Sequence, residues 1–183
     1  MIECEDIEIV RKCLSGNSNE FEKLIDKYQR VIFNIAYRMT SNYHDAEDIT
    51  QAVFIKVYEK LDTFHQKFKF FSWIYRIAVN DTINLIKQKK RSEDLKSDLL
   101  STQRTPEESF EEKELNEKLQ KALMDIDPEY KILIILKHLQ NFSYKEIAYI
   151  VDIPEKKVKS RLFSARQILR DVLEQRGITS HVA

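Results

Sequence analysis

Hydrophobic positions recur at intervals of three and four residues along most of the chain, which is the spacing of helices that bury one face. In the first half this spacing predicts a short N-terminal helix that ends near Ser15-Gly16 and a long helix from Phe21 to about Met39. Ser41-Asn42 interrupts the pattern. A further helix is predicted from about His44 to Leu61, with acidic residues near its N-terminus, where the helix dipole favours negative charge.

The second half begins with a polar interruption and then resumes the helical spacing. Residues 92–105 lose aromatic residues and periodicity, so this segment is predicted to be a linker. Thr105-Pro106-Glu107-Glu108 has the spacing of a capping box and places proline at the first helical position. Asp127-Pro128-Glu129 starts another helix in the same manner, which continues to about Gln140, and Asn141 suits a left-handed C-cap.

The composition also favours helices. Two glycines and three prolines occur among 183 residues, whereas sheets and phosphate-binding loops use glycine for tight turns and close backbone approach. No G-x-G-x-x-G or Walker sequence is present, which excludes most nucleotide-dependent enzymes. The predicted fold class is all-α, with two small helical domains, 1–91 and 106–176, joined by a flexible linker over 92–105.

Residue types that usually hold metals are scattered along the chain. Cys4 and Cys13 lie near the N-terminus and the four histidines are far apart, so we expect no metal site, no disulfide framework and no cofactor. No apolar run approaches the roughly 20 residues of a membrane span, and the acidic start is unlike a signal peptide. We therefore expect a protein of the reducing cytoplasm with no membrane insertion.

The formal net charge of zero conceals alternating blocks of charge. Residues 1–61 carry 8 basic and 11 acidic side chains, whereas 62–91 carry 7 basic and 2 acidic ones. Residues 92–130 carry 5 basic and 12 acidic side chains, and 131–176 carry 10 and 5. Two basic blocks of this kind indicate two surfaces that face a polyanion, separated by an acidic spacer.

Residues 143–170 have the pattern of a helix-turn-helix. Ser143 and Glu146 form a capping box at the start of a short helix, and Asp152-Ile153-Pro154 forms the turn. The second helix keeps one apolar face and one basic face, which is the geometry that places side chains in a DNA major groove. An ordinary helical hairpin is the alternative, and five basic residues within eleven positions count against it.

The exposed face of this second helix supplies one set of candidate DNA contacts. Side chains near its centre are expected to read base edges, and arginines at its sides are expected to contact phosphates. The predicted base readers are Lys159, Ser160 and Phe163, and the further predicted contacts are Lys156, Arg161 and Arg166.

The basic block at 62–91 contains an aromatic, cationic stripe. A loop over 62–69 leads into a helix on which one tryptophan, several amides and several cations share a face. Cations suit phosphates, aromatic rings stack on bases and amides can hydrogen-bond base edges, so this face suits DNA whose strands are separating. Core packing remains open for Phe68, Phe70 and Tyr75. The predicted contacts are Lys67, Lys69, Trp73, Arg76, Asn80, Asn84 and Lys87.

Three segments together resemble the extracytoplasmic-function (ECF) group of bacterial RNA polymerase sigma factors. The sequence DAEDITQAVFIKVYEKL at 45–61 resembles the region 2 segment that docks on the clamp helices of the polymerase β′ subunit. The stretch 68–91, with FFSWIYRIAVN, resembles the part that melts and reads the promoter minus-ten element. Residues 143–170 resemble the region 4 helix-turn-helix that reads the minus-thirty-five element.

The resemblance implies partners and roles for individual residues. It implies core RNA polymerase, through the β′ clamp helices and the β flap, promoter DNA, and a cognate anti-sigma factor. Trp73 and Asn80 match positions associated with strand separation and with holding an unstacked base. A carboxylate cluster on a docking helix also suits the arginines of a clamp helix. The residues expected to face polymerase are Asp45, Glu47, Asp48 and Gln51, although Asp45 could also cap its helix.

Two departures from the family pattern bear on these expectations. Ala52 stands where glutamate is frequent, so one polymerase contact is expected to be absent. Asp152 replaces the usual turn glycine, and because aspartate tolerates a left-handed backbone the turn is still expected.

Two other classes of protein are alternatives to a sigma factor. A stand-alone helix-turn-helix regulator would leave the Trp73 stripe unexplained. A nucleic-acid enzyme lacks a carboxylate–metal constellation, since Glu47 and Asp48 are adjacent and point apart on a helix. The sequence therefore favours a non-enzymatic sigma factor.

Overall fold

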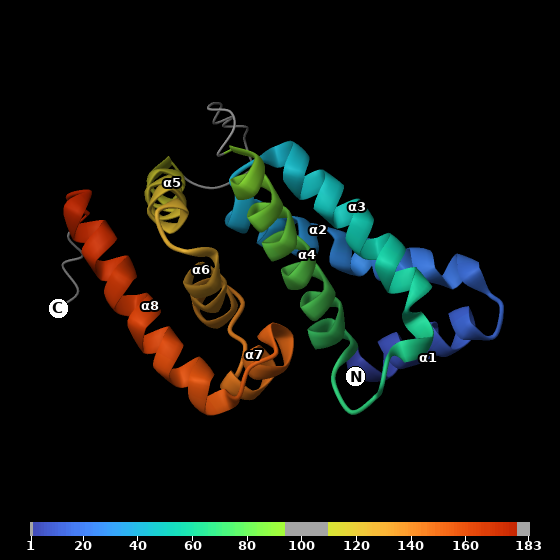
Figure 1. Ribbon diagram of the computed structural model, residues 1–183. Coiled ribbons are helices and arrows are strands. Elements are labelled where there is room, and N and C mark those ends of the chain that lie inside the picture. The colour runs from blue at the N-terminus through green and yellow to red at the C-terminus, as the bar shows by residue number, and fades with distance from the viewer. Residues whose placement is uncertain (1, 94–109, 179–183) are drawn as a thin grey trace.

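The computed structural model describes residues 2–93 and 110–178, which form helices joined by short turns (Figure 1). Helices α1 to α4 form the first half and α5 to α8 the second. The first half comprises α1 (Ile2–Leu14), η1 (Ser18–Glu20), α2 (Phe21–Thr40), α3 (Tyr43–Glu59), η2 (Leu61–Thr63) and α4 (Phe70–Glu93). The second comprises α5 (Phe110–Met124), α6 (Pro128–Ile134), a π-helical turn η3 (Ile135–Leu139), α7 (Tyr144–Val151) and α8 (Glu155–Gln175).

The turns form where the sequence predicts them, and for the predicted reasons. Ser41, Asn141 and Asp152 adopt left-handed backbone with φ of 54°, 55° and 56°, so each ends a helix without a glycine. The capping box of Ser143 and Glu146 is present with both of its hydrogen bonds. The predicted linker differs in part, because α4 continues through 92–93. The rest of that linker and the capping box at Thr105–Glu108 lie outside the described residues.

The first domain is built around three long helices. Helices α2, α3 and α4 pack together and bury Leu24, Ile32, Val53 and Ile74 completely. Helix α1 is linked to α2 by its buried Asp6. The Asp6 carboxylate accepts a hydrogen bond of 2.5 Å from the Tyr28 hydroxyl and also pairs with Lys27. This packing fixes the directions in which α3 and α4 present their outer faces.

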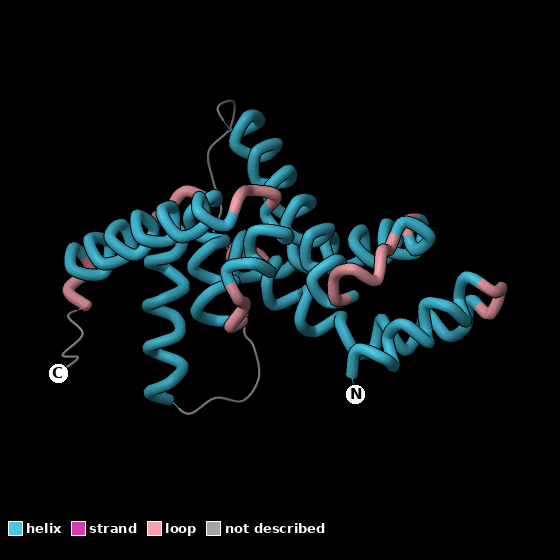
Figure 2. Tube along the Cα trace, turned by 90° about the horizontal axis from the view of Figure 1, so that it is seen from below, coloured by secondary structure: helices cyan, strands magenta, loops and turns pink. Residues whose placement is uncertain are grey.

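In the second domain, the long helix α8 packs against the shorter helices α6 and α7. Ile132 of α6, Leu136 of η3, Ile147 of α7 and Leu162 of α8 are all buried in the core of this domain. Helix α6 begins at Pro128, with the Asp127 carboxylate accepting a hydrogen bond from the Glu129 backbone N–H. Figure 2 shows from below that α8, the helix that leads to the C-terminal end, lies at one side of the molecule, and its residues 156, 159 and 160 are exposed.

The two domains share one continuous hydrophobic core. Phe142, which is buried, stacks on Phe71 of α4 with ring centroids 5.3 Å apart and meets the edge of Tyr75 at 5.0 Å. The Tyr75 hydroxyl donates a 2.9 Å hydrogen bond to the side-chain oxygen of Gln140. Phe70 and Tyr75 are thus core residues, which decides a question that the sequence left open, and α4 lies beside α7 (Figure 1).

Side chains of the second domain also complete the C-terminus of α2. The last carbonyls of a helix have no partner within it. Gln120 of α5 donates to the carbonyls of Tyr37 and Arg38 at 3.4 and 3.2 Å, and the Lys131 ammonium donates to that of Met39 at 3.2 Å. A cation here also suits the negative end of the helix dipole. The contact between the domains therefore combines specific hydrogen bonds with apolar packing.

Candidate nucleic-acid interface

Helix α8 presents a basic face with an exposed aromatic ring. Its inner side is fixed by Val158, Leu162 and Ala165, which are buried at spacings of four and three. On the outer side the ring of Phe163 is 64% exposed and lies among basic residues. Residues 156, 159, 160 and 166 are exposed on this helix as well. The turn and the two helices therefore present this face in the manner of a DNA-reading helix-turn-helix.

Two members of the predicted set on α8 are engaged within the domain. Arg161 is half-buried and pairs with Glu129 at 3.4 Å. The Arg166 Nε donates a 3.1 Å hydrogen bond to Nε2 of His138. Burial and then the charges of Arg166 and Lys137 hold the pKa of His138 below its ordinary value, so the imidazole is neutral and accepts that bond.

The predicted stripe on α4 is only partly exposed. Asn80, Asn84 and Lys87 face solvent, as does Lys67 in the preceding loop. Trp73 differs from the expected cationic, exposed position, because it is 8% exposed and packs between Phe64 and Phe70 with ring centroids 5.5 and 5.6 Å away. Its indole belongs to an aromatic cluster under the loop, so contact with a base would require that cluster to open.

Three cations near or on α4 lie against carboxylates of the second domain. Lys69 lies 3.7 Å from Glu146, and Lys87 lies 3.6 Å from Glu129. Arg76 lies 3.1 Å from the Asp152 carboxylate, and it also donates to the Tyr149 carbonyl at 3.1 Å. In this arrangement the second domain covers part of the surface that the sequence assigns to DNA.

Aromatic contacts reinforce this arrangement. Phe68, for which the sequence left core packing open, stacks on Tyr149 with ring centroids 3.7 Å apart. The Arg76 guanidinium lies over the Tyr149 ring, 5.1 Å from its centre. Burial raises the pKa of Tyr149 although Arg76 opposes the shift, so the hydroxyl stays protonated at neutral pH. Phe68 therefore packs against the second domain and not in the core of the first.

Helix α3 presents a mixed acidic and apolar stripe. Asp48 and Gln51 are exposed as expected, and Ile55 and Tyr58 continue their stripe one and two turns further along. Ile55 is 59% exposed and Tyr58 is 49% exposed, so this face has apolar surface that no described element covers. Sequence reasoning missed both residues, although the intervals from 48 to 51, 55 and 58 were a detectable signal.

The two remaining acids of the predicted polymerase set have partners within the first domain. The Asp45 carboxylate accepts hydrogen bonds of 2.6 and 2.7 Å from Lys89 of α4. Glu47 lies 3.8 Å from the His44 ring. Asn42, and not Asp45, caps α3, since its side chain accepts the Asp45 backbone N–H. Asp48 and Gln51 are therefore the more accessible pair.

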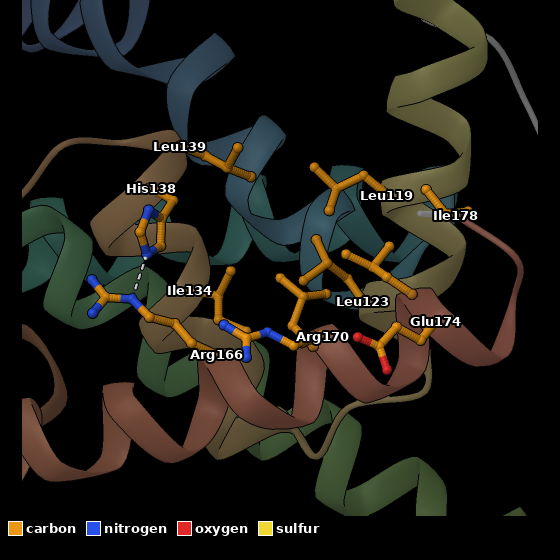
Figure 3. A pocket seen from close by; sticks show the side chains of 11 residues that line it. Leu119, Leu123, Ile134, His138, Leu139, Arg166, Arg170, Glu174 and Ile178 are labelled. Carbon is orange, nitrogen blue, oxygen red and sulfur yellow. Dashed lines mark hydrogen bonds between the residues drawn. The ribbon is translucent and has the colours of Figure 1, made fainter. Parts of the chain in front are cut away.

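An apolar groove of about 320 Å³ lies on the second domain between α5, η3 and α8. Figure 3 shows Leu119 and Leu123 on one side of it and Arg166 and Arg170 reaching over it from α8. Leu139 at its edge is partly exposed. This groove gives the second domain an apolar surface besides the face of α8 that carries Phe163.

Within the described ranges 2–93 and 110–178, no three His, Cys, Asp or Glu side chains are grouped as a metal site would require. None of the helices in that part of the chain combines the length and apolar character needed to cross a bilayer.

Two family models match the chain, one in each helical domain. Residues 24–92 match the family model described as Sigma-70 region 2. Residues 116–169 match the model described as Sigma-70, region 4. The first match contains α3 and nearly all of α4, and the second contains the helix-turn-helix.

Two of the solved structures that share the fold are similar over most of both chains. The chain is 20% identical to CnrH in its complex with the cytosolic domain of CnrY, with a TM-score of 0.68 over 91% of this chain and 96% of that one. It is 23% identical to the sigma factor RpoE of Bartonella quintana in complex with the anti-sigma factor NepR, with a TM-score of 0.71 over 85% and 97% of the two chains.

Sequence relatives extend over nearly the whole chain. The ECF RNA polymerase sigma factor SigW of Bacillus subtilis is 32% identical over 176 residues, covering 90% of this chain and 94% of the relative. The ECF sigma-E factor of Escherichia coli is 30% identical over 176 residues, covering 90% and 92%. These matches include region 2 as well as the helix-turn-helix, so they do not favour the alternative of a stand-alone helix-turn-helix regulator. With its region 2 and region 4 helices in this order, the chain belongs to the ECF family of RNA polymerase sigma factors.

Proposed function

We propose that this chain binds core RNA polymerase, directs it to specific promoters and helps to melt the minus-ten element. It acts without catalysis of its own and works in the cytoplasm, where polymerase is. Region 2, within 1–91, would bind polymerase and read the minus-ten element, and region 4, within 106–176, would read the minus-thirty-five element. The observation that carries the proposal is the presence in one chain of three distinct outer faces, on α3, α4 and α8.

The α3 face is proposed to bind the β′ clamp helices. Asp48 and Gln51 offer acceptors to arginines, and the exposed side chains of Ile55 and Tyr58 offer apolar surface beside them. A charged rim around an apolar centre is how protein interfaces commonly combine specificity with affinity. Asp45 and Glu47 would contribute from the edge of this face. The β flap is proposed to contact the second domain, where the groove beside Leu139 offers apolar surface.

The α4 and α8 faces are proposed to bind promoter DNA. On α8, Lys159, Ser160 and Phe163 would read base edges in the major groove, with Lys156, Arg161 and Arg166 on phosphates. On α4, the exposed amides of Asn80 and Asn84 would bind unstacked bases. The cations Lys67, Lys69, Arg76 and Lys87 would hold the backbone of the separated strand, and Trp73 would stack once its cluster opens.

An anti-sigma factor is proposed as a further partner. CnrH and the Bartonella quintana RpoE, the two solved structures described above, are each in complex with a second protein, which is named as an anti-sigma factor in the case of RpoE. No described residue identifies that partner for this chain.

The test is transcription with purified components. The protein is mixed with core RNA polymerase and a library of promoter fragments, and specific run-off transcripts are sequenced. Transcripts that appear only when the protein is added, and that share two upstream elements, are expected. Transcripts that do not depend on the added protein would refute the proposal.

A further inference from the structure

Arg166 of α8 and His138 of the π-helical turn η3 meet at the rim of the apolar groove. The Arg166 Nε–H donates a 3.1 Å hydrogen bond to Nε2 of His138, which Figure 3 shows as a dashed line. Both side chains are exposed at this edge of the second domain. Arg166 belongs to the set proposed to contact DNA phosphates, so its partner within the domain bears on how the guanidinium meets DNA.

The acceptor of this hydrogen bond carries no charge. Burial and then the charges of Arg166 and Lys137 hold the pKa of His138 below its ordinary value, so Nε2 offers a lone pair to the arginine at neutral pH. Arg161, the other arginine of the proposed set, instead pairs with the Glu129 carboxylate at 3.4 Å. A carboxylate competes with phosphate for a guanidinium, whereas a neutral imidazole leaves the positive charge of Arg166 uncompensated.

The hydrogen bond uses one N–H group of the five that a guanidinium carries. The two terminal amino groups form the planar fork that binds phosphate oxygens in pairs. A partner at Nε therefore orients this fork and leaves the fork itself to a phosphate. Because the side chain is ordered before DNA arrives, less conformational freedom is lost on binding.

The fold fixes both ends of this hydrogen bond. On α8, Ala165 is fully buried, which anchors the helix directly beside Arg166. On the other side, Lys137 precedes His138 in η3, and its ammonium donates a 3.1 Å hydrogen bond to the Phe142 carbonyl. Turns of this π-helical type are frequent at functional sites. The imidazole is therefore held by a turn that is tied to the segment leading into α7.

We propose that His138 is a positioning residue for promoter recognition, which aims the guanidinium of Arg166 at a phosphate of the minus-thirty-five element. The inference rests on the proposed function of α8. It adds to that function a residue outside the helix-turn-helix segment 143–170. His138 does not touch DNA and acts only through Arg166.

The first test reads the tautomer of His138 without DNA. An Nε2 that accepts a hydrogen bond is unprotonated, so the neutral ring carries its proton on Nδ1. Nitrogen-15 NMR of the full-length chain at neutral pH should show Nδ1–H for His138, assigned by the signal that disappears in His138→Gln. In Arg166→Ala the ring should lose this preference. An Nε2–H ring in the wild type would overturn the inference, whatever the chain does on DNA.

The second test measures DNA binding by the holoenzyme, core RNA polymerase reconstituted with the full-length chain. The probe is a labelled duplex from a fragment that gives specific run-off transcripts, cut upstream of its minus-ten element so that no strands separate. Fluorescence anisotropy at several salt concentrations gives the affinity. Arg166→Ala should weaken binding at least about tenfold. It should also reduce the slope of log affinity against log salt by about 0.9, the contribution of one phosphate on a duplex.

His138→Ala should weaken binding about threefold to tenfold, since the arginine must then be ordered when DNA binds. His138→Gln should bind within about twofold of the wild type, because the glutamine side-chain oxygen can accept from Arg166. The double variant His138→Ala with Arg166→Ala should bind no more weakly than Arg166→Ala alone, since the two residues act as one unit.

The matched control is Lys121→Ala, which removes an exposed cation of α5 and should bind like the wild type. Urea denaturation verifies that the variants have the stability of the wild type. Losses that add in the double variant would show that His138 acts independently of Arg166. A His138→Gln variant as weak as His138→Ala would show that the imidazole itself contacts DNA. Either result would overturn the inference.

Failure of the proposed function gives a different pattern. Arg166→Ala that binds like the wild type would refute the phosphate assignment of Arg166, and the inference with it. If no fragment gives run-off transcripts that depend on the chain, the proposed function and the role of His138 in it fail together. The NMR result would then report only the hydrogen bond between the two side chains.

Discussion

At the scale of single residues, burial separates side chains that the sequence places on one stripe. Trp73 and Asn80 are seven positions apart and therefore share a face, yet Trp73 is buried among aromatic rings and Asn80 is exposed. Replacing Trp73 by alanine would leave a cavity and cost about 3–5 kcal/mol of stability before any effect on DNA. Asn80 therefore gives the cleaner test of the α4 face.

Asn80→Ala is expected to reduce open-complex formation roughly tenfold, which corresponds to the loss of one base contact. Its free energy of unfolding should change by no more than about 0.5 kcal/mol, since the side chain is exposed. Permanganate reactivity of unpaired thymines measures the first quantity and urea denaturation the second. Asn34→Ala, an exposed asparagine of α2, is the control. Unchanged reactivity for Asn80→Ala would remove Asn80 from the proposed interface.

Lys131 gives a prediction for pH. Burial lowers its pKa from 10.5 to about 8, although Asp127 and Asp125 oppose the shift. The folded state therefore binds fewer protons than the unfolded state between these two values, so this residue makes stability rise with pH in that window. From pH 7 to 9 the free energy of unfolding should rise by about 1 kcal/mol. Only the part of this interval above pH 8 lies between the two pKa values, where one full pH unit contributes at most about 1.4 kcal/mol.

Other groups also titrate in this range, so the measurement is a comparison. Urea denaturation of the wild type and of Lys131→Met at pH 7 and 9 isolates the contribution of the lysine. The wild type should gain about 1 kcal/mol more than the variant over this interval. The same pH dependence in both proteins would show that Lys131 is not the cause.

At the scale of elements, helix ends were the most predictable features. Capping depends on residues within four positions of one another, so Ser143, Glu146 and Asp127 could be interpreted without tertiary structure. The left-handed ends at Asn141 and Asp152 follow from short polar side chains in the same way. The π-helical turn at Ile135–Leu139 was not predicted, because those residues have an ordinary helical spacing.

Ser143→Ala tests the importance of such an end. It removes the acceptor for the Glu146 backbone N–H and should destabilise the protein by about 1 kcal/mol in urea denaturation. Ser164→Ala, an exposed position within α8, should be neutral or slightly stabilising because alanine is the better helix former. Equal effects of the two substitutions would contradict a capping role for Ser143.

At the scale of the whole molecule, the two domains share one hydrophobic core and are therefore expected to unfold as one cooperative unit. A core that is continuous across α4, α6 and α7 links the unfolding of one domain to that of the other. The sequence predicts two domains and a linker but not this contact. Phe142 follows a left-handed residue and looks like a loop residue in the sequence, and only packing makes it the centre of the shared core.

Phe142→Ala should uncouple the domains. Wild-type protein is expected to unfold in one transition in differential scanning calorimetry. The variant should lose about 3–5 kcal/mol and show two transitions. Phe54→Ala removes an equally buried ring that packs on Phe21 inside the first domain, and it should not lower the melting of the second domain selectively. Two transitions in the wild type would refute a shared core.

The sequence by itself determined the helices, their ends, the order of the three functional segments and the basic face of α8, because each of these depends on residues close together in the chain. Tertiary structure alone decided that Trp73 and Tyr75 are buried, that Ile55 and Tyr58 remain exposed, and that Glu129, Glu146 and Asp152 face the cations of α4. The burial of Tyr75 and the approach of the carboxylates to α4 depend on residues about 40 to 80 positions apart, brought together by the packing of the two domains. Trp73 is buried by Phe64 and Phe70 of its own segment, because the loop before α4 folds back over the helix.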